Sequence, residues 1–214
     1  MAKTLGVVDR VEHLRRRYVV LYGASLVAQA TGVSRAALHF QNAAVAVAEQ
    51  RGIAGTIVEA YTRRAEPREG LEAGSGAADL DVARRRSREV SDPSRARLYA
   101  GLIDAIEGSS LLDLQPAAAR ERFGRALDFF VTYDPTDVPR LHLGRGRASN
   151  RLGDVEEARK DFLAGVRAFE AGRLKVAAEN RVAYFDAAHE LFDQLVALSA
   201  TDPHAAFAFA ERGR

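Results

Sequence analysis

Apolar residues recur every three or four positions along most of the chain, which is the spacing of one face of an α-helix. Short polar or glycine-containing breaks separate these runs, and the strict alternation that is typical of strands is scarce. The pattern therefore predicts an all-α fold. The expected helices span residues 7–30, 34–50, 53–64, 79–90, 93–108, 116–130, two helices within 139–170, then 174–198 and 205–212.

Several breaks carry residues with a defined role at a helix end. Asp92-Pro93 places a capping carboxylate before a proline that suits a first helical turn, and Asp202-Pro203 is expected to restart the last helix. Ser34 is the expected N-cap of the second helix. Residues 66–78 contain Pro67 and three glycines, so we expect a mobile internal loop there.

The most regular stretch is Pro139 to Glu170, where two helical runs flank a Gly153-Asp154 turn. A small residue stands in the first run, and an alanine, an aromatic residue and a glycine follow in the second: Gly146, then Ala158, Phe162 and Gly165. Antiparallel helices approach closely only where their contact positions lack bulk. This spacing resembles a tetratricopeptide (TPR) unit, which needs stacked neighbours to bury its apolar face.

Two looser copies of the spacing occur upstream. Residues 17–50 hold Ala36, Phe40 and Ala43, and residues 116–130 hold Ala119, Phe123 and Ala126. The intervals between copies are irregular, so the repeat is degenerate. We expect residues 1–214 to form a single TPR-like solenoid of antiparallel helix pairs, wound as a right-handed α-α superhelix.

The last third of the chain is more specific than a general TPR pattern. Its features are Gly146-Arg147-Ala148, Gly153-Asp154, Asp161, Glu170, RVAYF at 181–185, Leu191-Phe192-Asp193, Ala206-Phe207 and AERGR at 210–214. Residues 138–214 thereby resemble the TPR region upstream of the peptidase domain in bacterial CHAT proteins, whose caspase-like domains are associated with TPRs. The resemblance implies a regulatory module with a downstream caspase-like domain in the parent chain. No catalytic residue is carried over, because this chain holds no catalytic domain.

Composition narrows the chemistry. The chain has no cysteine, which excludes thiolate metal sites and cysteine nucleophiles and fits a reducing, cytoplasmic setting. Its 31 Lys and Arg against 29 Asp and Glu give a net charge of +2 without a basic stripe, so we expect no nucleic-acid partner.

No apolar run is long enough to span a membrane. Residues 15–30 imitate a signal peptide, but the same segment fits a first TPR helix, which is the interpretation we favour. The histidines and serines form no metal-ligand or nucleophile motif, so we expect no enzyme activity, no metal and no cofactor.

The best candidate site is the concave face, which the first helix of each TPR pair lines. Five positions of one helix face are expected there: Arg140, Leu143, Arg147, Asn150 and Arg151. Three guanidinium groups and an amide can bind a carboxylate or a phosphate through paired hydrogen bonds. The alternative is that these arginines pair with acids of adjacent helices, such as Glu179, or face solvent.

Two functional hypotheses follow. The first is a non-catalytic TPR scaffold that binds a protein or peptide ligand and regulates a CHAT caspase-like protease. The second is the helical sensor segment of a bacterial transcriptional or signalling regulator, by analogy of fold alone. An apolar face on the last helix, at Phe207 and Ala210, would favour self-association.

Overall fold

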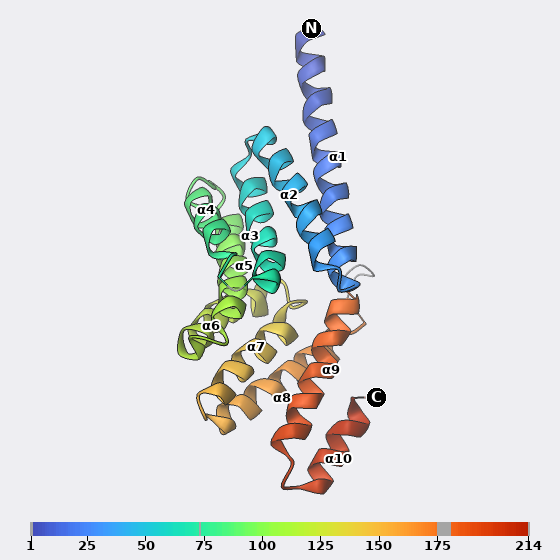
Figure 1. Ribbon diagram of the computed structural model, residues 1–214, viewed down its shortest axis with the longest axis vertical. Helices are drawn as coiled ribbons and strands as arrows, with labels where there is room; N and C mark the ends of the chain where they lie inside the picture. Colours follow the sequence, from blue (N-terminus) through green and yellow to red (C-terminus); the bar gives the residue numbers. More distant parts are fainter. Residues whose placement is uncertain (1, 73, 175–180, 214) are drawn as a thin grey trace. The chain divides into compact units, whose positions relative to one another are not determined.

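The computed structural model describes residues 2–72, 74–174 and 181–213, and these residues form ten α-helices and no strand (Figure 1). The all-α prediction is confirmed. The helices are α1 (Ala2–Ala30), α2 (Ser34–Arg51), α3 (Ala54–Leu71), α4 (Ala77–Ser87), α5 (Pro93–Leu111), α6 (Pro116–Tyr133), α7 (Val138–Arg151), α8 (Val155–Gly172), α9 (Arg181–Leu198) and α10 (Pro203–Arg212).

The chain divides into two compact units, Met1–Ile106 and Glu107–Arg214. In the first unit α1 packs on α2, α2 on α3, and α3 on α4. In the second, α6 to α10 pack in succession, and α7 also contacts α9. Packing of each helix on the next is consistent with an all-α helical repeat fold. The right-handed superhelix and the single solenoid over residues 1–214 stay predictions.

The α7–α8 pair is built around one close approach. A Cβ placed on Gly146 would lie only 2.4 Å from the ring of Phe162, which is completely buried. Gly153 closes the turn between the helices with a φ of 79°, a conformation that glycine adopts without strain. Leu191 of α9 packs against Gly165 in the same way, and a Cβ on this glycine would lie 2.7 Å from the leucine side chain. The small and aromatic positions of this unit thus make the close contacts that their spacing predicts.

Phe123 makes the corresponding contact in α6. Its buried ring lies against two glycines of neighbouring helices, since a Cβ would stand 3.1 Å from the ring at Gly108 and 2.5 Å at Gly144. Ala119 and Ala126 are fully buried beside it. One ring therefore packs against both α5 and α7.

In the first unit the close-packed positions lie one residue later than predicted. Ala36, Phe40 and Ala43 are only half-buried, whereas the positions that follow them, Ala37, Gln41 and Ala44, are buried. Alanines at both 36 and 37 and at both 43 and 44 made the two registers indistinguishable by size.

A polar contact decides the register. Gln41 stands where Phe162 stands in the later pair, and its Nε2 donates to Ser25 Oγ at 2.5 Å. Ser25 takes the place of Gly146 in the same spacing, and its hydroxyl donates to the carbonyl of Tyr22. Both side chains are buried, and a buried polar group without a partner is costly. Hydrogen bonding thus replaces the glycine–aromatic contact in this pair.

The loop predicted over residues 66–78 is wrong for most of its length. Helix α3 continues to Leu71 with Pro67 inside it, and α4 begins at Ala77. Pro67 is buried, so its ring contributes packing to α3 although proline has no backbone N–H to donate a hydrogen bond. Glu69 accepts hydrogen bonds from the amides of Gly74 and Gly76 at 2.7 and 3.2 Å, which fixes the turn.

A buried ion pair joins α3 to α4. Asp79 is 2% exposed and accepts from Arg64 at 2.9 and 2.6 Å and from Arg68 at 3.1 Å. The hydrogen bond with Asp79 is the chief reason that the pKa of Arg64 lies above its usual value. This contact depends on residues on either side of the expected loop, which is why local composition did not reveal it.

The remaining boundaries gave mixed outcomes. Asp92 caps α5 by accepting from the amides of Ser94 and Arg95, so this capping prediction is confirmed, and the structure shows that Asp202 caps α10 in the same manner. Ser34 is the first residue of α2 rather than its N-cap, which is Val33. The helix predicted over 174–198 is described over Arg181–Leu198, and residues 175–180 lie outside the described part of the chain.

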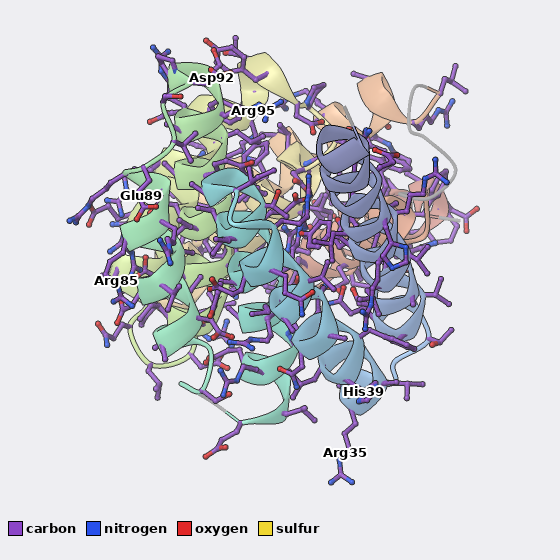
Figure 2. All side chains as sticks on the ribbon, turned by 90° about the horizontal axis from the view of Figure 1, so that it is seen from above. Arg35, His39, Arg85, Glu89, Asp92 and Arg95 are labelled. Carbon is purple, nitrogen blue, oxygen red and sulfur yellow. The ribbon has the colours of Figure 1, made fainter. Side chains whose placement is uncertain are left out.

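Charged side chains cover the outer faces of the helices. Figure 2 shows Arg35 and His39 projecting from α2, and Arg85 and Arg95 from α4 and α5. Several arginines pair with an acid one turn away, as in Arg84–Asp81, Arg86–Glu89 and Arg95–Asp92. These arginines belong to exposed helix faces of mixed charge.

Replacing Gly146 with alanine should lower the free energy of unfolding by about 1–3 kcal/mol, because the new methyl group meets the buried Phe162 ring. Gly124, in α6, has open space around it, so Gly124→Ala should raise stability by about 0.5–1 kcal/mol through helix propensity. Urea unfolding of both variants measures the difference. If Gly146→Ala and Gly124→Ala changed stability equally, the close approach of Gly146 to Phe162 would be contradicted.

Replacing Ser25 with alanine should cost about 1–3 kcal/mol, because Gln41 loses its acceptor in a buried site. The double variant Ser25→Ala/Gln41→Leu should be less destabilised than the sum of its two single variants. Ser34→Ala, at a residue that does not cap α2, should change stability by less than about 0.5 kcal/mol. Additive single effects in this cycle would count against the register described above.

Candidate functional site

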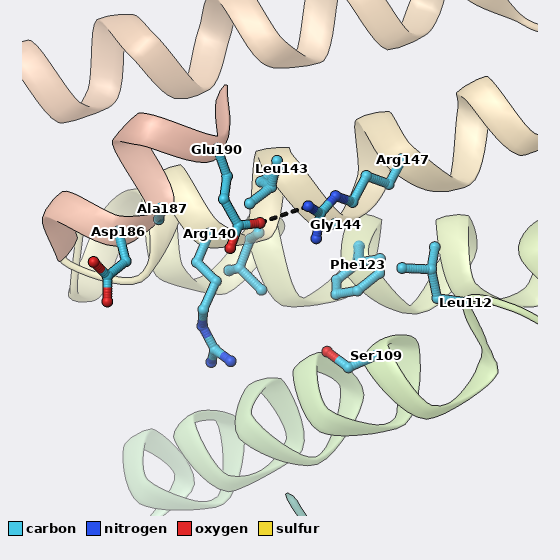
Figure 3. A pocket seen from close by; sticks show the side chains of 11 residues that line it. Ser109, Leu112, Phe123, Arg140, Leu143, Gly144, Arg147, Asp186, Ala187 and Glu190 are labelled. Carbon is cyan, nitrogen blue, oxygen red and sulfur yellow. Dashed lines mark hydrogen bonds and ion pairs between the residues drawn. The ribbon is translucent and has the colours of Figure 1, made fainter. Parts of the chain in front are cut away.

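A cavity of about 350 Å³ lies beside α7 in the second unit (Figure 3). This volume is at the lower end of the range for small-ligand sites, about 300–1,000 Å³. Three of the five predicted groove residues line it, Arg140, Leu143 and Arg147. The other lining residues come from the end of α5 and the segment after it, from α6, from α7 and from α9: Ser109, Leu112, Phe123, Leu141, Gly144, Asp186, Ala187 and Glu190.

The floor of the cavity is apolar because of the packing already described. Phe123 presents its ring beside Gly144, and a side chain at that position would collide with the ring. Leu143 and Ala187 are buried and add aliphatic surface from α7 and α9. The glycine therefore allows α6 and α7 to approach and also leaves an apolar surface at the base of the cavity.

The rim carries opposite charges on two helices. Arg147 of α7 donates to Glu190 of α9 at 2.5 Å, and Figure 3 shows this bond beside Gly144. Arg140 lies 3.8 Å from Asp137, the residue just before α7. The Arg147 and Glu190 side chains are 34% and 47% exposed, and such a pair contributes only about 0–1 kcal/mol to stability. A ligand can therefore displace Arg147 or Glu190 from this pair at little cost in free energy.

The last two predicted groove residues lie elsewhere. Asn150 and Arg151 are exposed, and neither lines the cavity. Arg151 forms an ion pair with Asp113, in the connection between α5 and α6. Glu179, considered as a partner for these arginines, lies outside the described residues. The structure thus pairs Arg147 and Arg151 with acids from other segments, which is one of the alternatives that sequence spacing left open.

Sequence reasoning did not identify a charged cluster on another face of α7. Asp161 of α8 is 6% exposed and accepts from the Nε and Nη2 atoms of Arg145 at distances between 2.7 and 3.0 Å. The Nδ1 of His142 lies 2.9 Å from the same carboxylate. Asp161 matched the family pattern, but its partners follow only from the register between α7 and α8.

The cluster fixes the charge state of its acid. Burial alone would raise the pKa of Asp161, but the hydrogen bonds from His142 and Arg145 outweigh it and hold that pKa below its usual range. Asp161 is therefore ionised near neutral pH and serves to join α7 to α8 rather than to transfer protons. It borders a second, open hollow of about 570 Å³ that Arg120, Ser149 and Glu157 also line.

Within residues 2–72, 74–174 and 181–213, no group of three or more His, Asp or Glu side chains is arranged to hold a metal ion. Within the same residues, every helix is too short or too polar to cross a lipid bilayer.

Comparisons with protein-family models, with curated proteins and with solved structures found no match.

Replacing Asp161 with asparagine should lower stability by about 1–3 kcal/mol at neutral pH, because Arg145 and His142 lose an ionised acceptor. Since the folded pKa is depressed, the contribution of Asp161 is complete above its unfolded pKa of about 4 and disappears as the pH falls through the folded value.

The wild type should therefore lose more stability than the variant on acidification below about pH 4. Glu157→Gln, at an exposed position of the same helix, is the control and should change little. Urea unfolding at several pH values makes the measurement. Parallel pH profiles for the wild type and Asp161→Asn would be incompatible with the assigned role.

Proposed function

We propose that this chain is a non-catalytic TPR-like scaffold that binds a protein or peptide partner along α7. The observation that carries the proposal is the cavity with an apolar floor at Phe123 and Gly144 and a charged rim at Arg140, Arg147 and Glu190. Concave sites of this kind, largely apolar with a few placed polar groups, are the usual form of binding sites.

The floor and the rim would have different roles in binding. An apolar side chain of the partner would cover the Phe123 ring and the surface left open by Gly144. A carboxylate of the partner would bind Arg147 or Arg140, since guanidinium groups match carboxylates through two parallel hydrogen bonds. Glu190 would then exchange its bond with Arg147 for contact with solvent or with a cation of the partner.

We further propose that the module is the regulatory region of a bacterial CHAT caspase-like protease and acts in the cytoplasm. The support is the resemblance of residues 138–214 together with the packing of one of its matched positions, Gly146, against Phe162. Arg212 of α10 also pairs with Glu170 of α8 at 2.6 Å, so two matched segments are joined in space. Phe207 of α10 is 67% exposed, and self-association through that helix stays a prediction.

Short peptides that end in acidic residues should bind the chain, and Arg147→Glu should weaken that binding by about tenfold or more. The matched control is Arg151→Glu, which reverses another α7 arginine that does not line the cavity and should leave the affinity within about twofold. Fluorescence polarisation with labelled peptides gives the affinities. Unchanged binding by Arg147→Glu, or equal losses in both variants, would falsify the groove assignment.

The coding sequence around this chain separates the two functional hypotheses. A neighbouring caspase-like domain with its His and Cys supports the protease assignment, whereas a helix-turn-helix domain supports the sensor of a transcriptional regulator. Protease assays of the chain alone should show no turnover. Measurable proteolysis by the purified chain would contradict a non-catalytic role.

A further inference from the structure

The cavity beside α7 has charges of opposite sign on its two sides. The α7 side carries two cations, Arg140 and Arg147, and the α9 side carries two anions, Asp186 and Glu190. Arg147 and Glu190 meet at 2.5 Å, so one cation and one anion of the cavity stand within reach of a single small ligand. We propose that this cavity is a receptor site for a free α-amino acid with an apolar side chain.

The charge arrangement selects against simpler ligands. A phosphate or a fatty acid would satisfy the arginines but would bring its negative charge toward Glu190 and Asp186. An amine or a polyamine would meet the opposite repulsion at Arg140 and Arg147. A zwitterion satisfies both sides, with its carboxylate on the arginines and its ammonium group on the acids.

The apolar floor selects the side chain. Phe123, Leu143 and Ala187 offer apolar contact surface at the base of the cavity, and Gly144 contributes no side chain that would fill it. A volume of about 350 Å³ admits a side chain the size of leucine or phenylalanine. Glycine would lack this contact and should bind more weakly.

The Arg147–Glu190 bond brings a cation and an anion of the site together. The two groups lie 2.5 Å apart across the rim. An amino acid would replace that one bridge with two, carboxylate to arginine and ammonium to glutamate. The inference uses the groove of the proposed function but does not require a peptide partner, and an amino acid bound there would compete with one.

Isothermal titration of the full chain with L-leucine and L-phenylalanine provides the test, and we expect a Kd of about 0.01–1 mM for at least one of them. Three analogues remove one feature each: 4-methylpentanoate lacks the ammonium group, isopentylamine lacks the carboxylate, and glycine lacks the apolar side chain. Each should bind at least about tenfold more weakly than L-leucine.

Two further compounds distinguish a free amino acid from the end of a peptide. N-acetyl-leucine imitates a carboxyl-terminal residue, and leucinamide imitates an amino-terminal one. If either binds as tightly as L-leucine, the site recognises a chain end, and the amino-acid inference is overturned while the peptide proposal stands. If no amino acid binds although acidic-ended peptides do, the inference is likewise overturned without affecting the proposed function.

Variants locate the binding site. Arg147→Met and Glu190→Gln should each weaken amino-acid binding by about tenfold or more, whereas Arg151→Gln should leave it unchanged. Equal affinity in all three variants would place the ligand elsewhere and overturn the proposal. If a variant fails to fold, the analogue series on the wild type, together with amide chemical-shift changes in α7 and α9, decides the question.

Discussion

The contact on which the second unit most depends is a phenylalanine ring set against a glycine of the neighbouring helix. Phe162 fills the space at Gly146, and Phe123 fills it at Gly144. Helix axes can approach this closely only where one partner lacks a Cβ, and the ring then recovers the lost packing. Since both glycines are on α7, that helix is held from two directions, by α6 and by α8. Other positions of α7 carry the polar side chains Arg140, His142, Arg145 and Arg147.

This arrangement explains why one helix supplies both the stabilising ion cluster and the candidate site. Arg145 and His142 point to Asp161 of α8, whose charge is maintained by their hydrogen bonds. Arg140 and Arg147 lie at the cavity instead, opposite acids of α9. The cluster joins the helices, and the exposed bridge at the rim contributes little to stability and is open to exchange. Arg145 and Arg147 are about equally exposed, so their roles differ because the acid partner is buried at Asp161 and exposed at Glu190.

The first unit achieves a related packing with different chemistry. Ser25 and Gln41 occupy the places of a glycine and a phenylalanine, and a hydrogen bond takes over from the ring contact. Spacing alone suggested Phe40, which is half-buried. The glycine-rich segment after Pro67 was also misjudged, because Glu69 and the Asp79 ion pair fix a turn that composition describes as flexible. In both places a polar contact between separate segments overrode a local preference.

By itself the sequence determined the helical class, the capped start at Asp92, the restart at Asp202-Pro203, and the contact positions of the α7–α8 pair. These features depend on residues close together in the chain, so spacing and local hydrogen bonding are enough to specify them. Only the tertiary structure decided the register of α2, the short turn between α3 and α4, and which arginines reach the cavity. Each of these depends on a partner from another helix, Ser25, Asp79 or Glu190, whose position is fixed only when the helices pack.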